Sequence, residues 1–138
     1  MGVMTSQPIL LTRNKVVPAI IDFTEPATGT YGTYSQKAIG NHRALWGGNV
    51  DANRYVVFQG LGADRDFVFF TVFTDSDNIS GSFNYISHGY LNSDTNMDGN
   101  VAYQGAANDV DNFIFFNVLL HPLNTTSVIN FYITQQLP

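Results

Sequence analysis

The stretch Asp94-Thr95-Asn96-Met97-Asp98-Gly99-Asn100 decides how the rest of the chain is interpreted. Oxygen-bearing side chains recur at every second residue, and a glycine follows the third of them. In a curling segment alternate side chains point inward, and glycine allows a sharp turn because it adopts a positive φ without steric cost. This spacing is that of the first half of a D-x-[DN]-x-[DN]-G calcium loop.

Calcium is a hard cation that takes six to eight oxygen ligands at roughly 2.3–2.6 Å. At the seventh position of the loop, Asn100 would supply its backbone carbonyl. A standard loop closes with a bidentate Glu at position twelve, but Gly105 stands there in this chain. We therefore expect two later carboxylates to close the shell. The predicted metal ligands are Asp94, Asn96, Asp98, Asn100, Asp109 and Asp111.

The distribution of charge favours a bound cation in this half of the chain. The last basic residue is Arg65, and acidic residues continue beyond it without any Lys or Arg. Carboxylates that converge without a cation raise one another's pKa, and a divalent ion relieves the repulsion. The alternative is an ordinary turn rich in Asp, Asn and Gly, whose carboxylates are solvated.

Composition indicates a small protein with much β-structure and many turns. The 138 residues include eleven Phe and seven Tyr, no Cys, and a net charge of −5. The length predicts one domain or two small units, and we expect an α+β fold. The acidic balance argues against a nucleic-acid partner. Without cysteine there is no disulfide or thiol chemistry, and no apolar run approaches the length of a membrane span.

The N-terminal part is predicted to differ from the rest. Residues 1–25 hold two apolar runs, 9–12 and 16–23, and we expect them to form β-strands. An unpaired edge there would offer a neighbouring domain or chain a strand to pair with. Residues 26–44 are expected to be a linker, although 37–46 is ambiguous between a short strand and a turn of helix.

The remaining chain divides into two similar segments, 45–92 and 93–138. Their matching features are a Gln-Gly pair, an acidic pair and an aromatic run: Phe58-Gln59-Gly60 with Tyr103-Gln104-Gly105, Asp64-Arg65-Asp66 with Asp109-Val110-Asp111, and Phe67-Val68-Phe69-Phe70 with Phe113-Ile114-Phe115-Phe116. Repeated units of this kind pack together to share one core. Each is expected to contain a loop, a short strand and a short helix, the helices lying at 65–74 and 110–120.

The first segment contains a weaker counterpart of the calcium loop. Its candidate ligands are Asn49, Asp51, Asn53, Asp64 and Asp66. Arg54 stands where the second loop has Gly99. Three outcomes stay open: the loop binds calcium weakly, an Arg guanidinium neutralises its carboxylates in place of a metal, or Asn53 adopts the left-handed turn, which Asn tolerates.

The motif Asp94-x-Asn96-x-Asp98-Gly99 resembles the first half of the dockerin calcium loop, a relative of the EF-hand in which two loop–helix repeats pack together. Residues 45–138 resemble the paired repeats at the C-terminus of large exported bacterial surface proteins, which end in Gln-Leu-Pro as this chain does at 136–138. The resemblance implies two packed dockerin-like repeats, calcium as the bound ion, and an extracellular or cell-surface location. The absent ligand at position twelve and the reduced acidity of the first loop depart from that pattern.

No catalytic arrangement is recognisable. The histidines are scattered, and no nucleophile motif such as G-x-S-x-G occurs. We therefore expect a protein that is not an enzyme: a calcium-binding extracellular module that serves as spacer, anchor or assembly domain of a larger protein. The alternative is a calcium-dependent carbohydrate-binding or adhesive module, in which Trp46 or exposed tyrosines stack on sugars.

Overall fold

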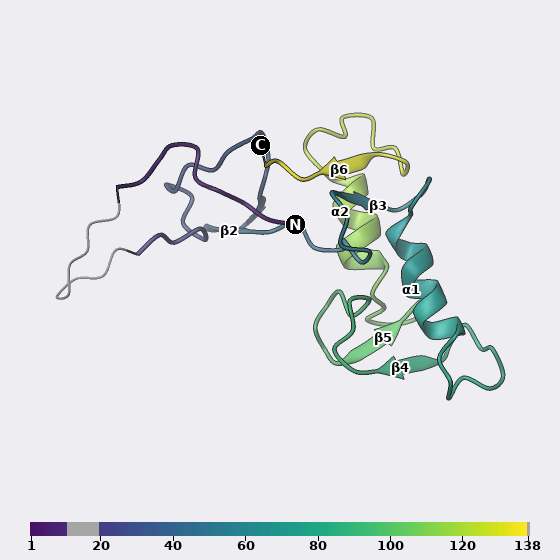
Figure 1. Ribbon diagram of the computed structural model, residues 1–138. Helices are drawn as coiled ribbons and strands as arrows, with labels where there is room; N and C mark the ends of the chain where they lie inside the picture. Colours follow the sequence, from purple (N-terminus) through teal and green to yellow (C-terminus); the bar gives the residue numbers. More distant parts are fainter. Residues whose placement is uncertain (11–19, 138) are drawn as a thin grey trace. The chain divides into compact units, whose positions relative to one another are not determined.

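The computed structural model describes residues 1–10 and 20–137, and it shows a small α+β fold with short strands and two helices (Figure 1). The chain divides into two compact units. The larger unit comprises Met1 and Gly47–Thr134, and the smaller comprises Gly2–Trp46 and Gln135–Pro138. The candidate calcium loops both belong to the larger unit.

Among its described residues the smaller unit contains an antiparallel hairpin, β1 (Lys37–Ile39) with β2 (His42–Ala44). Trp46 is 6% exposed, and its indole N–H donates to the carbonyl of Tyr34 at 2.8 Å. A buried indole needs such a partner for its one donor. Trp46 is therefore a core residue of this unit and is not available as an exposed stacking surface.

The strands expected within residues 1–25 are not found in the described part of that range, which has a single isolated bridge, Thr5 with Thr30. The side chain of Asp22 accepts from the N–H and the hydroxyl of Thr24 at 2.8 and 2.7 Å. These two bonds form a local Asx turn. Most of the run 16–23 lies outside the described residues. The hairpin instead occupies part of the segment predicted to be a linker.

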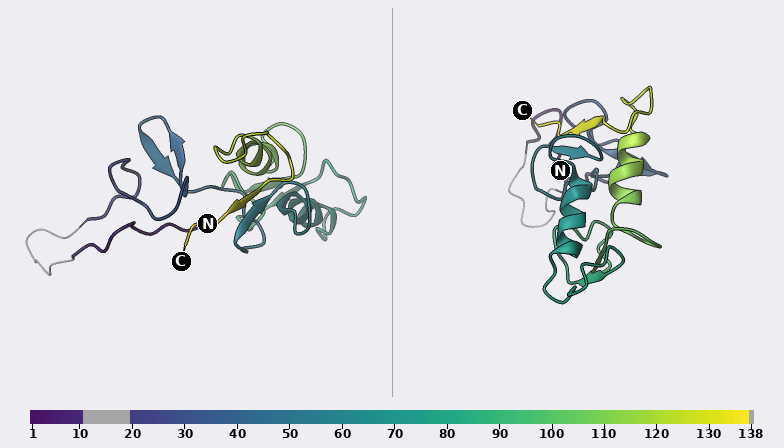
Figure 2. Two further views of the ribbon diagram at one scale, coloured as in Figure 1. Left: turned by 90° about the horizontal axis from the view of Figure 1, so that it is seen from above. Right: turned by 90° about the vertical axis from the view of Figure 1, so that its right-hand side faces the viewer.

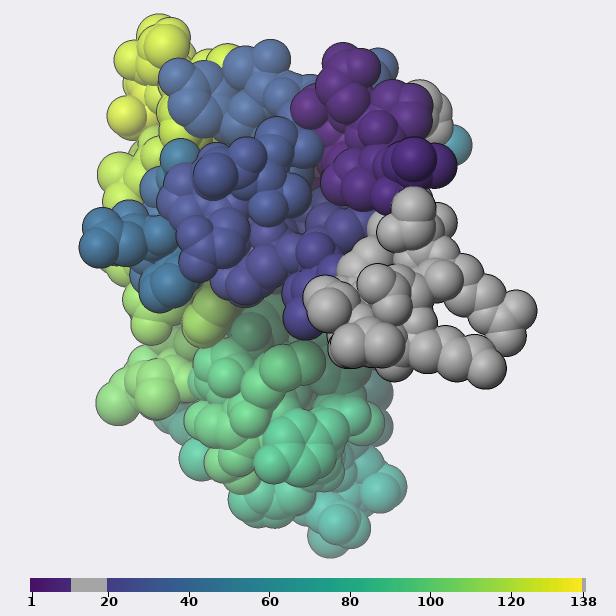
Figure 3. Space-filling model, turned by 90° about the vertical axis from the view of Figure 1, so that its left-hand side faces the viewer, coloured from purple at the N-terminus to yellow at the C-terminus, as the bar shows by residue number. Residues whose placement is uncertain are grey.

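The larger unit contains two short antiparallel ribbons. The strand β3 (Tyr55–Val57) pairs with β6 (Tyr132–Thr134), and β4 (Ile86–His88) pairs with β5 (Asn100–Ala102). The helices run alongside each other between the two ribbons (Figures 1 and 2). Residues around β4 and β5 form a continuous part of the surface, drawn in green in Figure 3.

Helix α1 (Asp64–Phe73) confirms the helix predicted at 65–74. Two acidic residues stand in its first turn, where they interact favourably with the helix dipole. Val68 and Val72, one turn apart, are 0% and 1% exposed, so they form the stripe that packs into the core.

The second helical segment confirms the helix predicted at 110–120. It begins as a π-helical turn, η1 (Asp111–Phe115), and continues as α2 (Phe116–Leu119). The wide turn is visible in its bonding, because the N–H of Phe115 donates to the carbonyl of Val110 at 2.8 Å. A π-turn accommodates one extra residue in a helix.

Buried residues and hydrogen bonds recur at a separation of 45 or 46 residues. Asn78 donates through Nδ2 to the carbonyls of Val72 and Ser82, at 2.8 and 2.9 Å. Asn124, 46 residues later, makes the same pair of bonds, each 2.8 Å long. The fully buried side chains follow the same spacing: Val56 with Val101, Val68 with Ile114, and Val72 with Val118. The core is thus contributed equally by both halves of the larger unit.

Candidate functional site

Residues 94–100, here called loop 2, curl around their own side chains. The carboxylate of Asp94 accepts the N–H groups of Asp98 at 3.1 Å and Gly99 at 2.9 Å. The side-chain carbonyl of Asn96 accepts the N–H of Asp98 at 2.8 Å, and Asp98 accepts the N–H of Asn100 at 2.8 Å. These bonds hold the three alternating oxygen side chains in one short loop. Loop 2 leads directly into β5.

The backbone of loop 2 turns through the left-handed region at two positions, Met97 with φ 61° and Gly99 with φ 83°. Glycine adopts this conformation readily, whereas Met does so at a cost. Tyr90, whose side chain is 80% exposed, lies against Gly99: a Cβ added to this glycine would sit 3.6 Å from the tyrosine ring.

Asp109 connects loop 2 to the strand that follows it. One carboxylate oxygen accepts the N–H of Thr95 at 2.8 Å and of Asn96 at 3.3 Å, and the other accepts the N–H of Ala102 at 2.8 Å. The hydroxyl of Thr95 adds a 2.6 Å bond to the Asp109 carbonyl. Asp109 is 0% exposed, and its oxygens face backbone donors at both ends of the segment.

Asp111 is placed differently from Asp109. It is exposed in the first turn of η1, and its carboxylate accepts from Nδ2 of Asn108 at 2.8 Å. The side-chain oxygen of Asn108 in turn accepts the N–H of Val110 at 3.0 Å and of Asp111 at 2.9 Å. The pair Asn108–Asp111 therefore closes the start of the helix.

Residues 49–55, here called loop 1, share one left-handed backbone position with loop 2. Ala52 has φ 58°, and it stands 45 residues before Met97. Neither Asn53 nor Arg54 is among the described residues with a positive φ, so of the three open outcomes the left-handed turn at Asn53 does not occur. The turn falls one residue earlier, at Ala52.

Asp64 holds loop 1 as Asp109 holds loop 2. Its two oxygens accept the N–H of Val50 at 2.6 Å and of Val57 at 2.7 Å. Burial raises the pKa of Asp64 to about 6, and the two N–H bonds oppose that shift. Burial likewise raises the pKa of Asp109, again against its backbone bonds.

The remaining acid of the first segment, Asp66, is not drawn into loop 1. It is exposed and pairs with Arg65 at 3.2 Å, while the Arg65 guanidinium also lies 4.9 Å from the ring of Phe58. An arginine therefore neutralises one candidate carboxylate of this segment, at the surface.

Across residues 1–10 and 20–137, no group of three or more His, Asp or Glu side chains is arranged to hold a metal ion. Loop 2 brings together two carboxylates, Asp94 and Asp98, with the amide oxygen of Asn96. A calcium ion there would depend on amide, peptide and water oxygens to complete its shell. This donor set is chemically suited to a hard cation.

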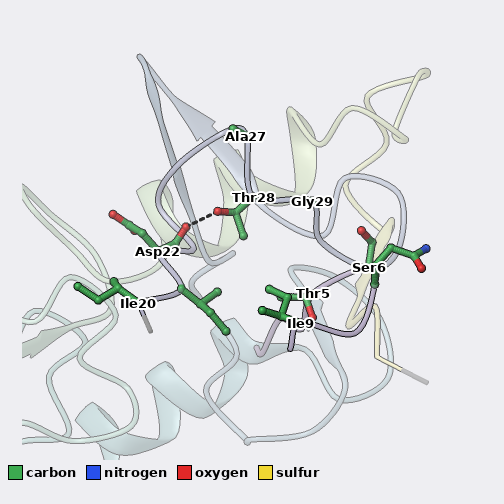
Figure 4. Close-up of a pocket in the computed structure, with 10 residues that line it drawn as sticks. Thr5, Ser6, Ile9, Ile20, Asp22, Ala27, Thr28 and Gly29 are labelled. Carbon is green, nitrogen blue, oxygen red and sulfur yellow. Dashed lines mark hydrogen bonds between the residues drawn. The ribbon is translucent and has the colours of Figure 1, made fainter. Parts of the chain in front are cut away.

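A cavity of about 300 Å³ lies in the smaller unit (Figure 4). Its lining includes Thr5, Ile9, Ile20, Asp22 and Thr28. The hydroxyl of Thr28 donates to the Asp22 carbonyl at 2.6 Å, and the Asp22 carboxylate is bonded to Thr24. The carbonyl and carboxylate of Asp22 and the hydroxyl of Thr28 are thus already hydrogen-bonded.

Sequence reasoning did not identify the asparagines that hold the connections after the helices. Asn78 and Asn124 are 6% and 5% exposed, and the side-chain oxygen of each also accepts an N–H four residues later, at 2.8 and 3.0 Å. Their recurrence at the repeat spacing was a signal that could have found them.

No protein-family model matches the chain, no curated protein matches it, and no solved structure matches it. Within the described segments, no helix has both the length and the apolarity that crossing a bilayer requires.

Proposed function

We propose that the larger unit is a non-catalytic calcium-binding module made of two diverged dockerin-like repeats, and that loop 2 carries the ion. The observation that carries the proposal is the arrangement of Asp94, Asn96 and Asp98, whose oxygens are held in one loop by bonds to the backbone of Asp98, Gly99 and Asn100. A carboxylate has about four acceptor positions, so these bonds leave capacity for a cation.

The repeat is supported by the correspondence of the two halves. Asp64 and Asp109 bind backbone N–H groups at positions that differ by 45 residues, namely Val50 and Val57 for the first and Thr95 and Ala102 for the second. A duplicated loop–strand–helix unit accounts for this spacing.

In this proposal the ligands are the side chains of Asp94, Asn96 and Asp98 and the carbonyl of Asn100. Asp109 positions the loop, since its oxygens face N–H groups, and Asp111 closes the helix start. When bound, calcium would neutralise the two carboxylates of a segment that has no Lys or Arg.

The role we propose is that of an extracellular or cell-surface module, a spacer, anchor or assembly domain within a larger protein. Extracellular modules bind calcium with dissociation constants of about 10⁻⁴–10⁻³ M. A site with two carboxylates and water-completed coordination fits this weak range, which is useful only where calcium is abundant.

The test is thermal unfolding followed by circular dichroism, in EDTA and in calcium. Ligand that binds the folded state alone adds about 2.7 kcal/mol at a hundredfold excess over Kd, so calcium should raise the melting temperature. Asp98→Ala should remove the increase, because Asp98 is an exposed member of the ligand set. Asp77→Ala, the same change at another exposed carboxylate, should keep it. Identical melting with calcium and EDTA would refute the proposal.

A second candidate is a calcium-dependent carbohydrate-binding module, and Tyr90 is the observation that favours it. Its largely exposed ring lies against Gly99 of loop 2, where a sugar could contact both the ring and the ion. Glycan-array binding that requires calcium and is lost in Tyr90→Ala would favour this function over the purely structural one.

A further inference from the structure

Loops 1 and 2 share part of their frame but differ in the donors that their side chains supply. The shared frame consists of the left-handed residues Ala52 and Met97, together with the buried carboxylates Asp64 and Asp109, which accept the N–H groups of Val50 and Thr95. At a separation of 45 residues, Asn49 corresponds to Asp94 and Asn53 to Asp98. Both carboxylates of loop 2 are thus amides in loop 1.

The amides of loop 1 act as donors within the loop. Asn49 donates through Nδ2 to the carbonyl of Asn53 at 2.6 Å, and Asn53 donates through Nδ2 to the carboxylate of Asp51 at 2.6 Å. In loop 2 the corresponding Asp94 and Asp98 accept and have no N–H to give. In loop 1 the side-chain amides of Asn49 and Asn53 therefore donate hydrogen bonds to oxygens of the same loop, a role that a cation could otherwise fill.

Loop 1 has fewer anionic oxygens than loop 2, since Asp51 is its one carboxylate between residues 49 and 55. The side-chain oxygens of Asp51 and Asn53 accept the N–H groups of Asn53 and Tyr55, at 3.1 and 2.5 Å, as Asn96 and Asp98 accept N–H groups two residues later in loop 2. Among the described residues, the one buried side-chain oxygen without a hydrogen-bond partner is Oδ1 of Asn49. Loop 1 thus offers a cation one negative charge against the two of loop 2, and that carboxylate already accepts from the Asn53 amide. Arg54 adds a positive charge where loop 2 has Gly99.

We infer that the chain binds one calcium ion rather than two, because the Asn49 and Asn53 amides close loop 1 in place of a cation. These asparagines determine the metal stoichiometry of the duplicated unit. The count of one rests on the proposed function of loop 2; the metal-free closure of loop 1 does not.

The first experiment counts calcium per chain of residues 1–138 by calorimetric titration. The natural chain should bind one equivalent, and Asp98→Ala none. The triple variant Asn49→Asp, Asn53→Asp, Arg54→Gly should bind two, since it restores the acceptors and the glycine of loop 2. Two equivalents in the natural chain, or one that survives Asp98→Ala and is lost in Asp51→Ala, would overturn the inference. So would a folded triple variant that binds only one.

The second experiment needs no metal and separates this inference from the function proposed for loop 2. Amide exchange measured by NMR in EDTA should show protection at the N–H groups of Asn53 and Tyr55, and Asn53→Ala should remove it at Tyr55. If the natural chain binds no calcium, the proposed function fails, while protected loop 1 amides still support closure by the asparagines. Rapid exchange in EDTA that calcium suppresses would show that loop 1 needs the ion.

Discussion

Asp64 and Asp109 are buried carboxylates stabilised by peptide N–H groups. Each joins the beginning of a loop to the end of the strand after it, through bonds of 2.6–2.8 Å at both oxygens. Hydrogen bonds to a charged group contribute about 1.5–3 kcal/mol each, and a buried donor left without a partner costs more. These two residues therefore contribute to folding whether or not a metal is bound.

Asp109→Asn should lower the free energy of unfolding in EDTA by about 2–4 kcal/mol, because the amide NH₂ would face one of the backbone donors that the carboxylate accepts. Urea unfolding measures the loss. Asp66→Asn is the matched control, since Asp66 is 53% exposed in its side chain and should change stability little. If Asp109→Asn leaves stability in EDTA unchanged and abolishes calcium binding, Asp109 is a ligand and not an anchor.

The raised pKa of Asp64, about 6 in the folded protein against an ordinary value of 3.8, predicts a pH dependence. The folded state then holds a proton that the unfolded state has lost between these values, so stability should rise as pH falls from about 6 towards 4. Urea midpoints in EDTA across this range measure it. Asp64→Asn should flatten the profile; an unchanged profile in that variant would exclude Asp64 as its source.

At the scale of the elements, strand pairing links the two halves of the larger unit. Because β3 pairs with β6 and β4 with β5, neither ribbon is formed by one half alone. Two-stranded ribbons are marginal in water by themselves, and here the helices and the buried positions of both ribbons complete them. We therefore expect local damage in one strand to destabilise the whole unit.

Ile133→Ala should destabilise the protein by about 2–5 kcal/mol, the usual cost of deleting a buried isoleucine side chain. Ile133 is 1% exposed and lies opposite Val56 across the β3–β6 pair. The control is Ile79→Ala, the same change at a side chain that is 96% exposed. Chemical denaturation with both variants measures the difference; equal effects would mean that Ile133 is not a core residue.

The side chain of Asn117, in α2 directly after the π-helical turn η1, contributes to the stability of this helical segment. Asn117, 1% exposed, donates through Nδ2 to the carbonyls of Phe113 at 2.8 Å and Gly47 at 3.2 Å. Asn117→Ala should cost about 1–3 kcal/mol, because it leaves two part-buried carbonyl groups without this donor. Asn112→Ala is the control, because it makes the same change at an exposed residue of η1 in the same helical segment. A stability equal to that of the control would show that the amide does not support the turn.

At the scale of the whole molecule, residues 47–134 of the larger unit contain a core and both strands of each ribbon, β3 with β6 and β4 with β5. A chain of residues 47–134 should therefore fold and keep the calcium response proposed for loop 2. The measurement is a comparison of amide NMR spectra of this fragment with those of the full chain, with calcium and in EDTA. Collapse of the fragment's spectrum to that of an unfolded chain under both conditions would show that the smaller unit is required for folding.

Local pattern was sufficient for several features. Both helical segments follow an acidic pair, as predicted, and their buried positions, Val68 with Val72 and Ile114 with Val118, lie one turn apart. The alternation of Asp94, Asn96 and Asp98 before Gly99 likewise indicated a curled loop, because side chains two residues apart are close in any such turn. Within the described part of residues 1–25 no strand forms, and the side chain of Asp22 makes a local Asx turn; most of the run 16–23 lies outside the described residues.

Tertiary structure alone decided which strands pair, where the extra residue of the second half is accommodated, and which atoms each carboxylate faces. Asp109 and Asp94 are the same residue type in the sequence, yet one accepts N–H groups from two distant segments and the other those of its own loop. The physical reason is that a hydrogen-bond partner depends on where the backbone returns in space. Sequence shows the oxygens that are present; the fold determines which of them are already engaged.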